Sequence, residues 1–162
     1  MESRDAQNWA KTVDTLDTGT LPEGAHNINV QGKHVLGPVH GFGQLWQKTY
    51  RLKFEGARVP PETVIAAWKE HFPKFWPKGN TMYKASAGIK PGDVGVINSN
   101  LPGNVTFMST GIYVIYADDI SFSFMTPEGH PWAGMVTFGA EEEDDATIAT
   151  VQVLVRANDP LY

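Results

Sequence analysis

The sequence predicts an α+β domain built on a curved antiparallel sheet of about seven strands, with a helix after the first strand. Three observations lead to this prediction: an alternating segment at residues 44–54, a helical pattern at residues 60–72, and a series of β-rich segments from residue 81 onward. One strand, one or two helices and then a run of strands is an order typical of α+β domains.

The first strand is predicted at residues 44–54. Trp46, Tyr50, Leu52 and Phe54 occupy alternate positions, as in a strand with one buried face. Lys48 has the same parity. We therefore expect these apolar side chains to face the interior, with Lys48 on that face or near its edge.

The helix is predicted to begin near Pro60, because prolines suit a first turn and Glu62 is favourable at its positive end. The spacing typical of one helix face, i, i+3, i+4 and i+7, relates Val64, Ala67, Trp68 and His71. Pro73 cannot continue the hydrogen-bond ladder, so the helix should end there, and a short second helix is expected at residues 72–76.

The rest of the chain predicts strand after strand, because it is rich in Val, Ile, Phe, Tyr and Thr and is divided by turn residues. The acidic run at residues 141–145 is expected to be a solvated hairpin tip. Strands are predicted near residues 82–86, 93–98, 105–116, 120–126, 132–141 and 147–157.

Two regions are expected. Residues 1–40 show little periodicity and predict an irregular N-terminal arm that wraps the domain or is partly disordered. Residues 41–162 predict one domain, and 162 residues are enough for a sizeable core. The N-terminus lacks the apolar segment of a signal peptide, so the cytoplasm is the expected location.

Composition argues against several functions. A net charge of -5 without a basic run gives no electrostatic surface for nucleic acid or for a membrane. The absence of cysteine excludes disulfides and thiolate chemistry. The five histidines have no metal-ligand spacing, and neither a phosphate-binding glycine loop nor a nucleophile elbow is present. We therefore predict no metal and no cofactor.

The element order resembles the helix-grip fold of the START-like superfamily, also called SRPBCC, which includes polyketide cyclases, lipid-transfer domains and plant allergen-type carriers. The resemblance rests on QLWQKTYRLKF, on VPPETVIAAWKEHFPKFWP and on the closing hairpin GMVTFGA…ATIATVQVLVRANDP. It covers residues 44–162 and includes no catalytic motif. It implies a fold with an internal cavity, which serves either carriage or catalysis.

The chain departs from this pattern at its C-terminus. The helix-grip fold normally closes with a long helix in the concave face of the sheet, whereas this chain stops at Tyr162, where such a helix should begin. Asp159 and Pro160 would suit the start of a helix. We therefore expect a truncated chain, or a partner such as a second copy in a homodimer, to account for the exposed face.

The candidate ligand-binding residues lie on the strands that such a fold curves around its cavity. They are mostly aromatic, as in pockets for apolar molecules, and Lys48 and two tyrosine hydroxyls add the polar groups that fix orientation. For each of them, packing in an ordinary core is the alternative. The candidates are Trp46, Lys48, Tyr50, Phe107, Tyr113, Phe122, Phe124 and Trp132.

Glu128 and His130 raise the question of an acid–base pair. They lie between Pro127, Gly129 and Pro131, in a stretch that must reverse the chain between two strands. We predict a hairpin turn near the opening of the cavity, without an essential catalytic pairing, because nothing nearby in the sequence would orient a base.

Three functions remain open. The first is binding of a hydrophobic or aromatic small molecule in an internal cavity. The second is a cyclase or aromatase acting on a poly-carbonyl substrate, with His130, Lys48 and Tyr50 as the first residues to test. The third is a protein-interaction module, similar to a co-chaperone, whose core is filled.

Overall fold

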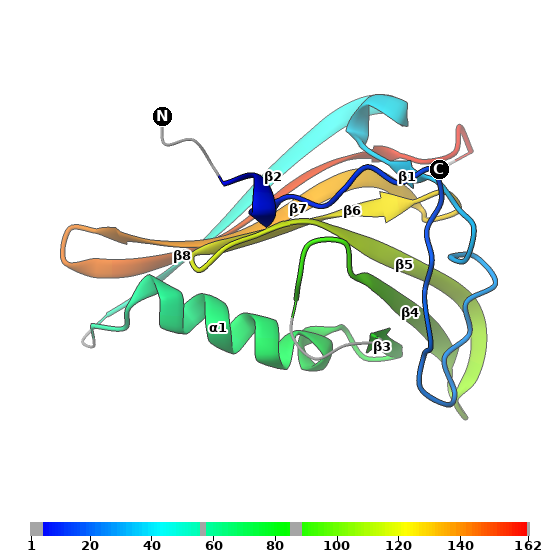
Figure 1. Ribbon diagram of the computed structural model, residues 1–162, viewed down its shortest axis with the longest axis horizontal. Coiled ribbons are helices and arrows are strands. Elements are labelled where there is room, and N and C mark those ends of the chain that lie inside the picture. Colours follow the sequence, from blue (N-terminus) through cyan, green and yellow to red (C-terminus); the bar gives the residue numbers. More distant parts are fainter. Residues whose placement is uncertain (1–4, 56–57, 85–88, 162) are drawn as a thin grey trace.

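The computed structural model describes residues 5–55, 58–84 and 89–161, and shows a curved antiparallel sheet with a helix beneath its concave face (Figure 1). The strands are β1 (Val35–Leu36), β2 (Phe42–Phe54), β3 (Asn80–Lys84), β4 (Val94–Leu101), β5 (Val105–Ala117), β6 (Ser121–Pro127), β7 (Trp132–Glu143) and β8 (Ala146–Ala157). The helices are α1 (Pro61–His71) and the 3-10 turns η1 (Ala6–Asn8), η2 (Pro38–His40) and η3 (Phe72–Phe75).

The strand order is β2-β8-β7-β6-β5-β4-β3, and the short β1 pairs with β6. Strands β3 to β8 form a meander, and β2 joins it beside β8. The segment with α1 and η3 therefore connects the two edges of the sheet, and it does so across the concave face. The predicted sheet with a helix after its first long strand is confirmed.

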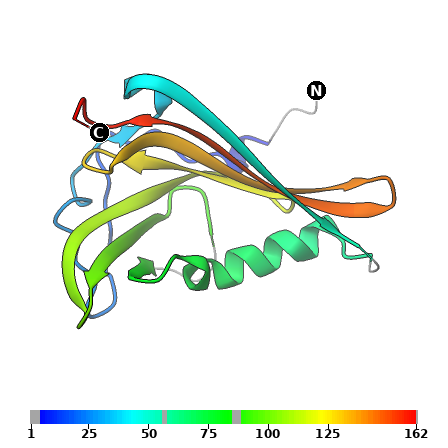
Figure 2. The same ribbon diagram turned by 180° about the vertical axis from the view of Figure 1, so that it is seen from behind.

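Helix α1 begins where its sequence favours a beginning. Pro61 is its first residue, Glu62 lies in the first turn and Lys69 in the last. The helix contacts β7 and β8, and the β7–β8 hairpin extends past its first turn (Figure 2). The sequence predicted Ala67 as part of the apolar face of this helix, and this is wrong, because Ala67 is exposed. The residues turned to the sheet are Val64, Ile65, Trp68 and Phe72.

The main core lies between α1 and the concave face, and Phe72 is at its centre. This ring is 4% exposed and makes edge-to-face contacts with Phe122, Phe124, Phe138 and Trp76, at centroid distances of 5.5, 5.9, 5.4 and 5.8 Å. Phe122 and Phe138 stack on neighbouring strands 4.8 Å apart. Edge-to-face rings add stabilisation beyond the area that they bury.

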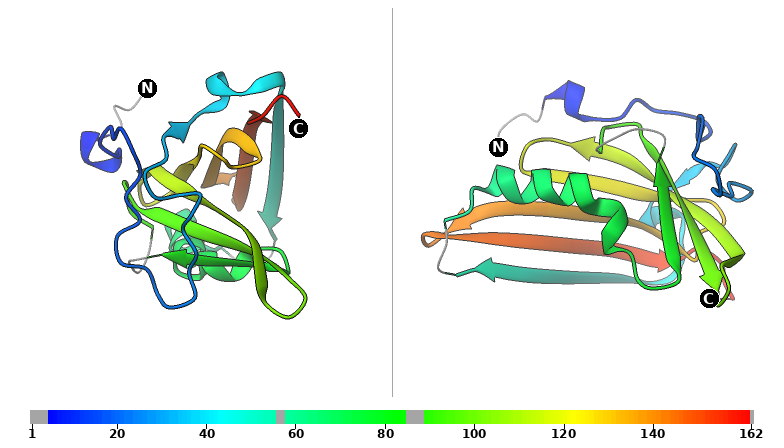
Figure 3. Two further views of the ribbon diagram at one scale, coloured as in Figure 1. Left: turned by 90° about the vertical axis from the view of Figure 1, so that its right-hand side faces the viewer. Right: turned by 90° about the horizontal axis from the view of Figure 1, so that it is seen from below.

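The N-terminal arm lies on the outer face of the sheet (Figure 3). Leu16 and Val30 are 1% and 0% exposed, and they pack with Val94, Val96 and Tyr113. Gly111 makes room for this packing, because a Cβ there would lie 3.1 Å from the Val30 side chain and 2.6 Å from a backbone oxygen. The arm thus forms a second core on the side opposite to α1.

The expected burial of strand β2 is wrong for three of its four apolar residues. Trp46, Tyr50 and Leu52 do share the concave face with Phe54, but they are 52%, 59% and 60% exposed. Only Phe54 reaches the core beside α1. The reason is that α1 covers one end of the concave face, and no other described residue covers the end that holds Trp46.

The acidic run forms the tip of the β7–β8 hairpin, as expected. Asp144 and Asp145 take positive φ angles of 50° and 61°, which suit a tight turn between strands. Exposed ion pairs join Arg51 to Glu143 at 2.5 Å and Arg58 to Asp145 at 2.9 Å. Among the described residues, no helix is long and apolar enough to span a membrane.

Candidate functional site

Inward-facing side chains of four strands form rows across the concave face. In one row, Lys48 of β2 faces Val153 of β8, Val153 faces Val136 of β7, and Val136 faces Phe124 of β6. The neighbouring row is Tyr50, Val151, Phe138 and Phe122. Side chains at alternate positions point to one face of a strand, so both rows line the same surface.

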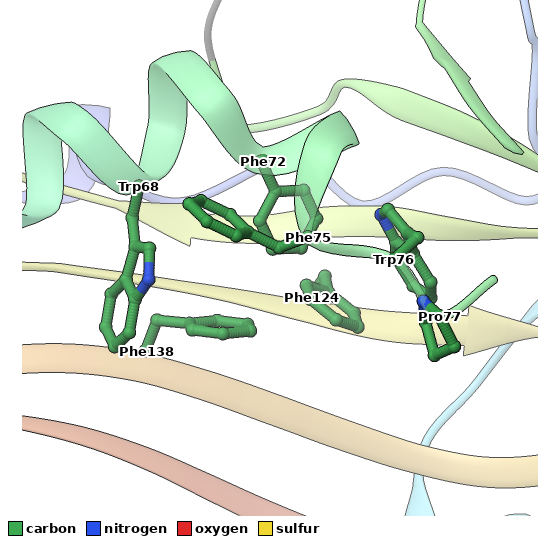
Figure 4. Close-up of a pocket in the computed structure, with 7 residues that line it drawn as sticks. All are labelled: Trp68, Phe72, Phe75, Trp76, Pro77, Phe124 and Phe138. Atoms are coloured by element: carbon green, nitrogen blue, oxygen red, sulfur yellow. The ribbon is translucent and has the colours of Figure 1, made fainter. Parts of the chain in front are cut away.

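The first cavity, which we call the aromatic cavity, lies between the end of α1 and the sheet (Figure 4). Its volume is about 210 Å³. Phe124 and Phe138 form its wall on the sheet side, and the remaining residues come from α1 and from the turn after it. The lining is almost wholly apolar, since it consists of aromatic residues and one proline. The ring nitrogen of Trp76 already has a partner, because it donates to the sulfur of Met82 at 3.0 Å. The lining residues are Trp68, Phe72, Phe75, Trp76, Pro77, Phe124 and Phe138.

The second cavity, which we call the open cleft, lies on the part of the concave face that α1 leaves uncovered. Its volume is about 410 Å³. It is lined by Trp46, Lys48 and Tyr50 of β2, Trp132 of β7, and Val153 and Val155 of β8. Within the described part of the chain, Lys48 forms no ion pair and no hydrogen bond. The open cleft is thus an aromatic surface with a single cation.

The structure brings five of the eight candidate binding residues to these cavities. Four of them, Trp46, Lys48, Tyr50 and Trp132, lie together in the open cleft, and Phe124 lies in the aromatic cavity. Their contact with a ligand stays a prediction. The sequence analysis missed most of the aromatic cavity, although the density of aromatic residues between Phe72 and Trp76 was a signal for it.

The other three candidates lie elsewhere, and their assignment to the cavity is corrected. Tyr113 is on the outer face, where its hydroxyl donates to the backbone oxygen of Lys11 at 3.0 Å and burial raises its pKa. Phe122 is 0% exposed and packs behind Phe138 in the core. Phe107 is 61% exposed and lines neither cavity. Alternation along a strand separates two faces, but it does not say which of them is concave.

Glu128 and His130 lie in the turn between β6 and β7, as predicted, and each has a backbone partner. The Glu128 carboxylate accepts the N–H of His34 at 2.9 Å, which fixes the arm beside β1. The Nδ1 atom of His130 accepts the N–H of Trp132 at 3.0 Å. No hydrogen bond or ion pair joins the two side chains in the described structure, so the turn has a structural explanation.

The His130 ring should make folding stability depend on pH. Burial lowers its pKa to about 4, although the Trp132 carbonyl, 3.1 Å from Nδ1, opposes this effect. The unfolded chain binds the proton near pH 6.5. The contribution of the neutral ring to stability is therefore fully present above pH 6.5. The free energy of unfolding should fall by up to about 3 kcal/mol as the pH falls to 4.

Chemical denaturation of the wild type and of His130→Asn at several pH values checks this expectation. An asparagine side chain also offers an acceptor to the Trp132 N–H but does not titrate. The loss between pH 6.5 and 4 should be smaller in the variant. An equal loss in both proteins would show that other groups cause it.

Comparisons with known proteins agree on the fold. No family model matches the sequence, and no curated protein is similar to it. Two crystal structures of ginseng major latex-like protein 151 from Panax ginseng superpose with TM-scores of 0.53 and 0.51, at 14% and 15% sequence identity. Each alignment covers 74% of this chain, and the two cover 84% and 87% of the ginseng protein.

Protein Ms6760 from Mycobacterium smegmatis is similar at 18% identity over 66% of this chain and 70% of its own, with a TM-score of 0.45. The two superpositions on the ginseng protein, with TM-scores above 0.5, support the fold described above. The chain has the helix-grip fold of START-like proteins.

Proposed function

We propose that the protein binds an apolar small molecule on the concave face of its sheet. The observation that supports this most is the open cleft, in which Trp46, Tyr50 and Trp132 are 52%, 59% and 49% exposed around an unfilled volume of about 410 Å³. A contiguous exposed aromatic surface is unusual on a soluble protein unless something binds there. A ligand in the cleft would bury these rings and gain the hydrophobic free energy of that area.

The geometry gives less support to the two alternatives. Of the three residues to test first in a cyclase, Lys48 and Tyr50 line the open cleft, whereas the His130 ring lies beside a different, polar cavity with Glu128 and Asn158. Its acceptor nitrogen is also occupied by Trp132. A protein-interaction module without a cavity would have a filled concave face, whereas two unfilled volumes lie on this one.

Binding of the neutral dye N-phenyl-1-naphthylamine, measured by fluorescence titration, tests the proposal. The wild type should bind it with saturation, and the double variant Trp46→Ala/Trp132→Ala should bind about tenfold more weakly or worse. Large aromatic side chains at the centre of a binding surface typically contribute this much. Both rings are about half exposed, so the fold should tolerate their loss.

Leu45→Ala is the matched control, because Leu45 precedes Trp46 on β2, is 42% exposed and does not line the open cleft. It should bind the dye as the wild type does. If the wild type fails to bind the dye, or if the double variant binds it unchanged, the open cleft is not the site.

A further inference from the structure

The charge of the open cleft points to the chemistry of its ligand. Lys48 lies between Trp46 and Tyr50 on one face of β2, and Val153 and Val155 line the floor beside it. None of the lining residues is acidic. Lys48 is exposed and has no ion-pair partner among the described residues, so a ligand with a negatively charged group would gain a charge-assisted contact there.

Tyr50 adds a second donor next to this cation. It follows Lys48 by two residues, so both side chains point to the concave face. Its hydroxyl makes no hydrogen bond in the part of the chain that the structure describes. Both side chains line the open cleft, so a carboxylate bound there has an ammonium and a hydroxyl available as donors.

The second cavity points to the ligand's length. Along the row that begins at Lys48, only Val136 separates Val153, which lines the open cleft, from Phe124, which lines the aromatic cavity. Three strand spacings separate Lys48 from Phe124, or about 14 Å between backbones. The polar end of this path is at β2, and the far end is lined by aromatic rings.

We propose that the open cleft and the aromatic cavity are two halves of a single site for a long-chain carboxylate. The carboxylate pairs with Lys48 and accepts a hydrogen bond from Tyr50. The apolar chain crosses the sheet over Val136 and ends among Phe124, Phe138 and Phe72. This inference rests on the proposed function, because it requires that the concave face binds a small molecule at all.

Isothermal titration calorimetry with dodecanoate and dodecanol, both below the concentrations at which they aggregate, tests the role of charge. The wild type should bind dodecanoate about tenfold more tightly than dodecanol, because a charge-assisted contact in an apolar cleft is worth about this much. Lys48→Met should remove this preference. It should leave the affinity for dodecanol unchanged within a factor of about two.

Lys53→Met is the matched control. Lys53 lies on the same strand, but its register partner is Ile148, so it points to the outer face. It removes the same charge from the protein without touching the cleft. If Lys53→Met lowers the affinity for dodecanoate as much as Lys48→Met does, the effect is one of net charge and the assignment to Lys48 is overturned.

A series of octanoate, dodecanoate and hexadecanoate tests the second half of the site. Affinity should rise with chain length beyond the part that fits the open cleft. Val136→Phe, which fills the crossing point with a larger side chain, should remove this rise while octanoate binds as before. Val136→Ala, which opens the same point, should keep the rise or increase it.

The possible failures are distinguishable. Equal affinity for octanoate and dodecanoate would overturn the two-part site. Equal affinity for dodecanoate and dodecanol would overturn the role of Lys48 while leaving apolar binding intact. If the neutral dye binds but no carboxylate does, the inference fails and the proposed function stands. If neither the dye nor a carboxylate binds, both fail.

Discussion

Phe72→Ala is expected to lower the free energy of unfolding by about 3–5 kcal/mol, the range for loss of a buried phenylalanine. Phe72 is 4% exposed and contacts Phe122, Phe124, Phe138 and Trp76. Its removal would leave a void between β6, β7 and the segment after η3, and the four rings around it cannot all move in to close it. Urea denaturation followed by circular dichroism measures the change.

Phe75→Ala is the control, because Phe75 lies in the same 3-10 turn, lines the same aromatic cavity and is 62% exposed. Its loss should cost less than about 1 kcal/mol, as is usual for exposed positions. Similar costs for the two variants would mean that α1 and η3 are not packed on the sheet as described.

Leu16→Ala should lower the free energy of unfolding by about 2–5 kcal/mol. Leu16 is 1% exposed under the arm, beside Val30 and the outer face of β4 and β5. The prediction follows from the second core: if the arm is part of the fold, a leucine in it behaves as a core leucine. Thermal and urea unfolding provide the measurement.

Ile28→Ala is the matched comparison for this prediction, since isoleucine and leucine have the same side-chain composition and Ile28 is 79% exposed in the same arm. It should change stability by no more than about 0.5 kcal/mol. An equally small effect of Leu16→Ala would mean that the arm detaches from the sheet in solution at little cost.

The elements of the fold were predictable because their signals are local. Pro61 and Glu62 mark the start of α1, and alternating β-branched and aromatic residues mark the strands. Each predicted strand matches one in the structure within a few residues, although residues 85–86 of the one predicted at 82–86 lie outside the described residues. The antiparallel sheet then follows from short connections between successive strands.

The candidate site was predicted only in part, because its signals depend on contacts between distant segments. Alternation placed Trp46, Lys48 and Tyr50 on one face, and the structure agrees. It could not show that this face is exposed, since that depends on how far α1 reaches. Tyr113 was misplaced for a related reason: only the arm, about a hundred residues earlier, makes the outer face of β5 a buried one.

The pairing of β2 with β8 has a consequence for the order in which the chain assembles. Partners such as Trp46 and Val155 are roughly a hundred residues apart, and pairing over such distances is slow. During synthesis the first long strand has to wait for the last one before its backbone can pair. The charges of Lys48, Arg51 and Lys53 interrupt this apolar strand, and charges placed in this way generally lower the tendency of an unpaired strand to associate with other chains.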